Sequence, residues 1–194
     1  IFTISNLLPN AFEIHGEYNP SFGNVGHPEP IAQNLTSLSN KVKELQFDIG
    51  LATDGDADRL GVVDHLGRYV DSHRVFMLLL KYLYEDKGIK GKVVKTVSLT
   101  AMVESYCHKM GIECVETPVG FKYAAKYISE GGVIIGGEES GGLGTALHIP
   151  ERDGIFNGLL LVEMLVKRGR SIAQLCEELD VEFGAHRYAR RDVH

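Results

Sequence analysis

The chain has 194 residues, of which 44% are hydrophobic and 24% are charged, as is typical of one large globular domain or two smaller ones. Its formal net charge is −6 and its pI is near 5.7, which argues against a nucleic-acid partner because proteins that bind a phosphate backbone are usually basic. The apolar stretches are interrupted well before the ~20 residues of a membrane span, so we expect no membrane partner either.

The first half of the chain begins with a mixed segment and an irregular connection over 19–30 that is rich in proline. A helix is expected over 34–45, because its leucines and valine recur on one face. A short buried strand follows at 47–53 and ends where an acidic loop begins. Segments 61–64 and 68–70 then flank His65-Leu66-Gly67 and predict a hairpin.

The second half alternates helices with strands. A helical stripe starts near Val75, and Thr100 and Asp153 are candidate caps for later helices. The expected strands are 92–98, 112–116 and 132–136. The further expected helices are 100–110, 123–129, 153–166 and 171–179.

This alternation predicts an α/β fold with a mostly parallel, mixed sheet sandwiched by helices. We expect a domain boundary near residues 69–72. Ligands in such sheets gather beyond the carboxyl ends of the strands. The acidic loop and the segments 117–122 and 136–142 all follow expected strands, so they are predicted to share one site.

The acidic loop places three carboxylates, Asp54, Asp56 and Asp58, on alternate positions beside Arg59. Like charges this close require a cation, and a hard ion such as Mg²⁺ prefers oxygen ligands. An EF-hand is excluded, because its sixth and twelfth positions should be Gly and Glu but are Arg59 and His65 here. A solvated acidic turn remains the alternative.

Three other segments carry candidate ligand-binding groups. Residues 136–142 combine four glycines with Glu138, Glu139 and Ser140, which suits the hydroxyls of a sugar, although a plain glycine-rich turn is the alternative. Lys122 follows Gly120 in a turn that could hold a phosphate at a helix N-terminus. His148 and Arg152 precede a long apolar helix and could line the same site.

Together these segments resemble the α-D-phosphohexomutase family, which includes phosphoglucomutase and phosphomannomutase. The resemblance rests on the motifs Thr53–Arg59, Thr117–Lys122, Gly137–Gly142, His148–Gly154 and Asn19–Phe22, which follow the family's order along nearly the whole chain. It implies that residues 1–70 are the later part of domain 2 and carry the metal loop. Residues 71–185 would be domain 3 with the sugar loop, and 186–194 would lead toward a fourth domain.

The resemblance also implies an activity. The family moves phosphate between the 1- and 6-positions of a hexose through a phosphoserine and a hexose bisphosphate. By analogy, Asp54, Asp56 and Asp58 hold Mg²⁺ and Arg59 contacts the phosphoserine. Arg59 and Lys122 are the predicted catalytic residues. The predicted substrate contacts are Gly120, Glu138, Ser140, His148 and Arg152. Glucose or mannose phosphates are the expected substrates.

Two family motifs are absent from this sequence: the T-A-S-H-N-P-type serine loop of domain 1 and the R-x-S-G-T-type loop of domain 4. The chain begins at Ile1 in mid-pattern, so we expect a fragment that is inactive without domains 1 and 4. A non-catalytic module that binds sugar phosphate and Mg²⁺, or a phosphatase with an Asp nucleophile, is the alternative. Three widely spaced cysteines predict reduced thiols and a cytoplasmic location.

Overall fold

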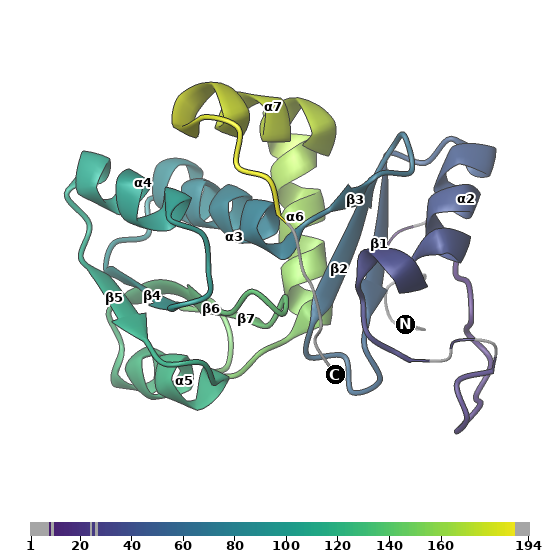
Figure 1. Cartoon of the computed structure of the whole chain (residues 1–194), viewed down its shortest axis with the longest axis horizontal. Helices are drawn as coiled ribbons and strands as arrows, with labels where there is room; N and C mark the ends of the chain where they lie inside the picture. The colour runs from purple at the N-terminus through teal and green to yellow at the C-terminus, as the bar shows by residue number, and fades with distance from the viewer. Residues whose placement is uncertain (1–7, 9, 24, 26, 189–194) are drawn as a thin grey trace.

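The computed structural model describes residues 8, 10–23, 25 and 27–188 (Figure 1). In its first part, a 3-10 turn at Ala32–Asn34 leads into helix α2 (Thr36–Leu45). Strands β1 (Ile49–Thr53), β2 (Leu60–Asp64) and β3 (Tyr69–Val70) form an antiparallel sheet in the order β1-β2-β3. The acidic loop is therefore the connection between two paired antiparallel strands.

The second part is built on a mixed sheet in the order β5-β4-β6-β7. Strands β4, β5 and β6 are parallel, and the short β7 pairs antiparallel with β6. The strands are β4 (Lys92–Thr96), β5 (Cys114–Thr117), β6 (Val133–Gly137) and β7 (Leu143–Thr145). The helices are α3 (Ser72–Lys81, continued by a π turn, Tyr82–Asp86), α4 (Met102–Met110), α5 (Phe121–Glu130), α6 (Gly154–Arg168) and α7 (Ile172–Phe183).

Helices cover both faces of the mixed sheet. On one face α5 packs against Val94 and Val133, and on the other α3, α4, α6 and α7 enclose the largest buried cluster. Neighbouring glycines show this alternation, since Gly136 faces Ala124 of α5 while Gly137 faces Phe76 of α3. The α/β class with a mixed sheet between helices is therefore confirmed.

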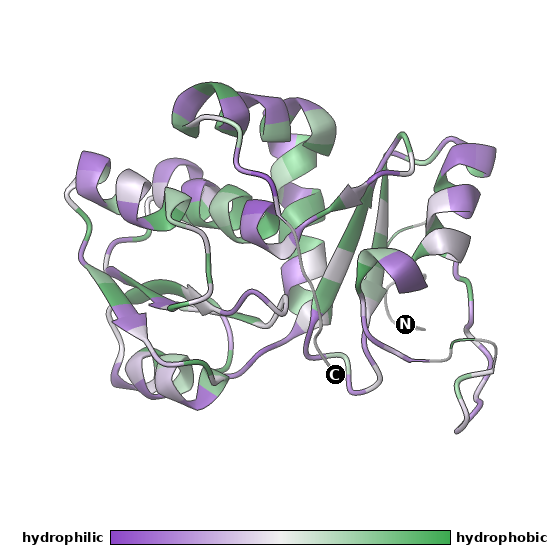
Figure 2. Cartoon of the chain, in the orientation of Figure 1, coloured by the Kyte–Doolittle hydropathy of each residue, from purple (hydrophilic) through white to green (hydrophobic). Residues whose placement is uncertain are grey.

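Helix α6 joins the two parts, because it packs against β1 and β2 as well as β7 and α3 (Figure 1). Figure 2 shows that β2 and the length of α6 beside it are largely hydrophobic. Gly158 allows the close approach, since a Cβ there would lie 3.2 Å from Leu51 Cδ1. The loops beside the first residues of α6 are consequently held in fixed positions relative to one another.

Most expected elements are present, with some differences. Strand β1 begins at Ile49 rather than Phe47, and β7 was not predicted because it is only three residues long and contains a glycine. Asp153 caps α6 as expected, accepting a hydrogen bond from the Phe156 N–H at 2.8 Å. Helix α4 begins at Met102, after Ala101, and the Thr100 hydroxyl accepts a hydrogen bond from the Met102 N–H at 3.2 Å, so Thr100 supplies the expected side-chain cap.

Two expectations concern the ends of the chain and the membrane. Most of the expected tail, residues 189–194, and most of the opening segment, residues 1–7 and 9, lie outside the described part of the structure. Among the residues that are described, no helix has the length and apolar character needed to cross a membrane.

Replacing Leu161 tests the packing role of α6. Leu161 is fully buried, so Leu161→Ala should lower the free energy of unfolding by about 3 kcal/mol in urea denaturation. Val166 on the same helix is 77% exposed, and Val166→Ala should change stability by less than about 0.5 kcal/mol. Equal effects of the two substitutions would contradict the described packing.

Candidate functional site

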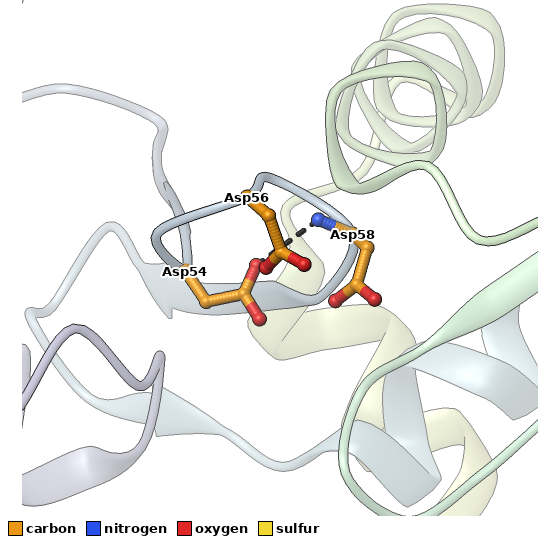
Figure 3. A group of neighbouring side chains, drawn as sticks. All are labelled: Asp54, Asp56 and Asp58. Carbon is orange, nitrogen blue, oxygen red and sulfur yellow. Dashed lines mark hydrogen bonds between the residues drawn. The ribbon is translucent and has the colours of Figure 1, made fainter. Parts of the chain in front are cut away.

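The acidic loop is organised around Asp54. Its Oδ1 accepts hydrogen bonds from the backbone N–H groups of Asp58 and Arg59 at 3.0 and 3.1 Å, and its Oδ2 accepts one from Arg59 Nε at 2.5 Å. Ala57 adopts a left-handed conformation with φ of 62°, which closes the turn. Figure 3 shows the three aspartates projecting from this one loop. One oxygen from each lies within 4.8 Å of the others.

The surroundings give the carboxylates different pKa values. Burial alone would raise the pKa of Asp54, but hydrogen bonds from Arg59 outweigh it and hold that pKa below its ordinary value. Burial raises the pKa of Asp58 to about 6, and Asp54 and Asp56 add to this against the effect of Arg152. Asp56 is exposed and makes no hydrogen bond or ion pair within the described ranges. The loop therefore carries negative charge that is only partly compensated.

The glycine-rich loop after β6 forms a tight turn into β7. The Glu138 N–H donates to the Gly142 carbonyl at 3.1 Å, and Gly141 has a φ of 93°. Glu138 is 6% exposed, and its Oε1 accepts a hydrogen bond from the Gly120 N–H at 3.0 Å. Burial raises the pKa of Glu138 above its ordinary value, although Gly120 and Arg152 oppose the rise.

Arg152 connects the two loops. Its Nη2 lies 2.5 Å from Asp58 Oδ2, and its Nη1 lies 3.6 Å from Glu138 Oε2. The Arg152 stem passes directly over Gly142, where an added Cβ would lie 2.4 Å from Arg152 Cδ. One guanidinium thus pairs with a carboxylate from each part of the chain.

Backbone contacts also hold the loops together. The Leu60 N–H donates to the Gly141 carbonyl at 3.1 Å, and the Gly154 N–H donates to the Ala57 carbonyl at 2.9 Å. Arg59 and Gly142 form an isolated antiparallel bridge. The acidic loop is therefore attached both to the glycine-rich loop and to the start of α6.

These contacts border an open cleft of about 370 Å³. It is lined by Asp54, Asp56, Asp58, Arg59, Glu138, Ser140 and Arg152. Seven of the ten residues predicted from the sequence therefore meet in one place, and the eighth, Gly120, touches it through Glu138. Charged and hydroxyl groups dominate the lining, so the cleft suits a small polar anion together with a cation.

Lys122 and His148 do not line this cleft. Lys122 is exposed, with its Nζ 5.1 Å from the centre of the Tyr123 ring. His148 stacks on Phe156, and its Nε2 lies 2.9 Å from Asp153 Oδ2. Their proposed substrate contacts stay predictions.

Sequence reasoning missed Glu29, whose Oε1 lies 3.4 Å from Arg59 Nη1. Glu29 belongs to the irregular segment before α2, thirty residues before Arg59, and no local pattern marks it as a partner. Arg59 thus contacts carboxylates on two sides, which fixes its guanidinium at the edge of the cleft.

Two family models match the chain. One, described as phosphoglucomutase/phosphomannomutase, alpha/beta/alpha domain II, matches residues 3–67. The other, described as alpha/beta/alpha domain III of the same family, matches residues 71–182. Together the two models span both parts of the structure.

Individual relatives agree with these matches. A phosphoglucosamine mutase of Campylobacter curvus is 38% identical over 173 residues, which are 89% of this chain and 36% of that protein. A solved Thermus thermophilus structure, assigned as a phosphomannomutase, is 38% identical with a TM-score of 0.81, covering 87% of this chain and 38% of that one. A phosphoglucomutase/phosphomannomutase family protein from Burkholderia thailandensis is 27% identical with a TM-score of 0.75, covering 83% and 35%. The chain thus spans about a third of the length of these relatives.

Removing the carboxylate charge of Asp56 tests the metal site. Asp56→Asn should weaken Mg²⁺ binding on the order of tenfold in calorimetry, because one charged oxygen ligand is lost. The metal-free melting temperature should not fall, since Asp56 is exposed, has no partner in the described structure and repels Asp58. Asp48→Asn, at another aspartate, just before β1, is the matched control. Equal Mg²⁺ affinities for both variants would contradict the assignment.

Proposed function

This chain belongs to the phosphoglucomutase/phosphomannomutase family, and we propose that it forms the metal-binding and sugar-recognising part of a phosphohexomutase. The enzyme would interconvert a hexose 1-phosphate and a hexose 6-phosphate through a phosphoserine and a hexose bisphosphate. The observation that carries this proposal is the single cleft that the acidic loop and the glycine-rich loop line together.

The acidic loop fits Mg²⁺. Asp54, Asp56 and Asp58 supply only carboxylate oxygens, the donor type that this hard ion prefers, and the three are close enough to share one ion. The hydrogen bonds on Asp54 leave a lone pair free on its Oδ2. When bound, Mg²⁺ would neutralise charge on the phosphate during transfer.

The two arginines at the cleft fit the phosphate of the substrate or the enzyme. Each carries a permanent positive charge and a planar fork of donors that matches phosphate oxygens. Arg59 is held by Asp54 and Glu29, and Arg152 by Asp58. Anchored in this way, both guanidinium groups would orient a phosphate without first losing much side-chain freedom.

Glu138 and Ser140 would contact the sugar. A carboxylate accepts hydrogen bonds from vicinal hydroxyls, and a serine hydroxyl can donate or accept. Such contacts tolerate a sugar that binds in two orientations, as a 1,6-bisphosphate must for both phosphates to reach one serine. Gly120, through its hydrogen bond to Glu138, would set the position of the carboxylate.

The sugar itself is proposed to be glucose or mannose. The relative from Campylobacter curvus is named a phosphoglucosamine mutase, which makes glucosamine phosphate the second candidate. Titrating the chain with the 1-phosphates of glucose, mannose and glucosamine would rank the three directly.

A phosphatase that uses an Asp nucleophile is the alternative enzyme. Asp54 accepts hydrogen bonds on both oxygens and is buried, so the exposed Asp56 would have to be the nucleophile. Release of inorganic phosphate from glucose 1-phosphate by the chain alone would favour this alternative over the mutase. A non-catalytic module that binds sugar phosphate and Mg²⁺ would use the same contacts as the mutase, so turnover separates these two.

We also propose where the chain divides into domains and that the chain is inactive by itself. We place the boundary near residues 69–72, which is supported by one family model ending at 67 and the next starting at 71. Because the sequence lacks a T-A-S-H-N-P-type serine loop, the chain alone should not interconvert glucose 1-phosphate and glucose 6-phosphate. The proposed location is the cytoplasm.

Glu138→Gln tests the sugar site. The variant should weaken binding of glucose 1-phosphate by the chain about tenfold in calorimetry with Mg²⁺ present, because a charged acceptor is lost. Its Mg²⁺ affinity should remain within about twofold of the unaltered chain. Glu130→Gln, at an exposed glutamate that ends α5, is the control. Unaltered sugar-phosphate binding by Glu138→Gln would remove Glu138 from the site.

A further inference from the structure

Glu139 lies between the two predicted sugar-binding residues, but its side chain does not point into the cleft as theirs do. Glu138 and Ser140 line the cleft, whereas Glu139 is not part of its lining. Instead, Glu139 Oε2 accepts a hydrogen bond from the hydroxyl of Ser98, in the loop after β4. The Glu139 side chain is therefore turned toward the loop after β4 rather than into the cleft.

The backbone of Glu139 is anchored as well. Its carbonyl accepts a hydrogen bond from the hydroxyl of Ser72, the first residue of α3, which is buried. The two serines come from different elements, so Glu139 ties the glycine-rich loop to the end of β4 and to the start of α3. On its other side the loop is bonded to the acidic loop through Gly141 and Leu60.

Ser98 and the loop around it are held in position by further hydrogen bonds. The Ser98 hydroxyl lies 3.2 Å from the hydroxyl of Thr96, which is fully buried in β4. Two residues after Ser98, the Thr100 N–H donates to His73 Nδ1 at 3.1 Å, which joins this loop to α3. The Ser98 hydroxyl that Glu139 contacts is therefore exposed but held in place by the neighbouring Thr96 hydroxyl.

A loop with several glycines needs such an anchor. Glycines allow tight turns but lose the most conformational freedom on folding, so residues 136–142 would otherwise sample many backbone arrangements. Recognition of a sugar hydroxyl requires acceptor and donor atoms held within a few tenths of an ångström. A charged carboxylate bonded to a hydroxyl is strong enough to restrict that freedom.

We propose that Glu139 is a positioning residue: bonded to Ser98 and Ser72, it fixes the direction in which Glu138 and Ser140 face the cleft. Its expected influence is on hexose-phosphate affinity and not on Mg²⁺ affinity, since the acidic loop keeps its own bonds to Arg59 and Arg152. The sugar part of this inference rests on the proposed function.

The position of Glu138 can be measured without any ligand. The Gly120 N–H donates to Glu138 Oε1, so hydrogen exchange at the Gly120 amide reports whether that carboxylate is in place. In the full chain, Glu139→Ala and Ser98→Ala should each speed this exchange about tenfold. The amide of Ala124, inside the same helix α5, is the internal reference and should not change.

A double-mutant cycle separates positioning from general destabilisation. If Ser98 acts through Glu139, the double variant should speed Gly120 exchange no more than either single variant. Glucose 1-phosphate affinity should fall about tenfold in each, while Mg²⁺ affinity stays within about twofold. Glu177→Ala, at an exposed glutamate of α7 with no hydrogen bond or ion pair among the described residues, is the control and should match the unaltered chain.

Unchanged exchange at Gly120, additive effects of the two substitutions, or equal acceleration at Ala124 would each overturn the inference. If Glu139→Ala fails to fold, the Gly120 exchange rate in Ser98→Ala decides the question. Ser98 is exposed, so its replacement should not prevent folding. If the unaltered chain binds none of the 1-phosphates of glucose, mannose and glucosamine, the proposed function fails. The Gly120 measurement then still tests the positioning role by itself.

Discussion

Negative charge in the acidic loop is the constraint on which the site depends. Three carboxylates with oxygens within 4.8 Å of one another repel unless positive charge is nearby. Arg59 compensates Asp54, and Arg152 compensates Asp58. Asp56 is left without an ion pair within the described part of the chain, so the loop still favours a cation. Arg59 and Arg152, which are permanently charged, therefore lie on either side of a site suited to a divalent cation.

Compensation by Arg152 has a structural consequence, because this residue belongs to the second part of the chain while Asp58 belongs to the first. The ion pair requires α6 to start beside the acidic loop. Gly154 makes this possible, since a Cβ there would lie 2.6 Å from the Arg59 carbonyl. Glu138 reaches the same guanidinium from the glycine-rich loop. Thus one side chain, Arg152, contacts both the acidic loop and the glycine-rich loop.

The sequence allowed much of this to be predicted, for identifiable reasons. Long apolar periodicities marked the helices, and the alternation of Asp54, Asp56 and Asp58 after an apolar strand marked the acidic loop as a candidate metal site. Glu29 could not be found, because its contact with Arg59 joins residues thirty positions apart through an irregular segment.

The sequence also did not show which way each side chain points. Residue type alone did not distinguish the neighbouring glutamates, and only the family resemblance selected Glu138, which lines the cleft while Glu139 faces Ser98. His148 preceded a helix at a suitable distance, but it stacks on Phe156 beside the helix cap. Spacing places a residue near a site, whereas the tertiary contacts of its loop decide which way the side chain turns.

Anomalous diffraction from crystals of this chain soaked with Mn²⁺, which binds the same carboxylate oxygens as Mg²⁺, tests the metal site directly. We expect one strong peak within coordination distance of Asp54, Asp56 and Asp58, with Glu138 and Ser140 lining the same cleft. A peak elsewhere, or an acidic loop that stays empty while Arg152 remains on Asp58, would contradict this expectation.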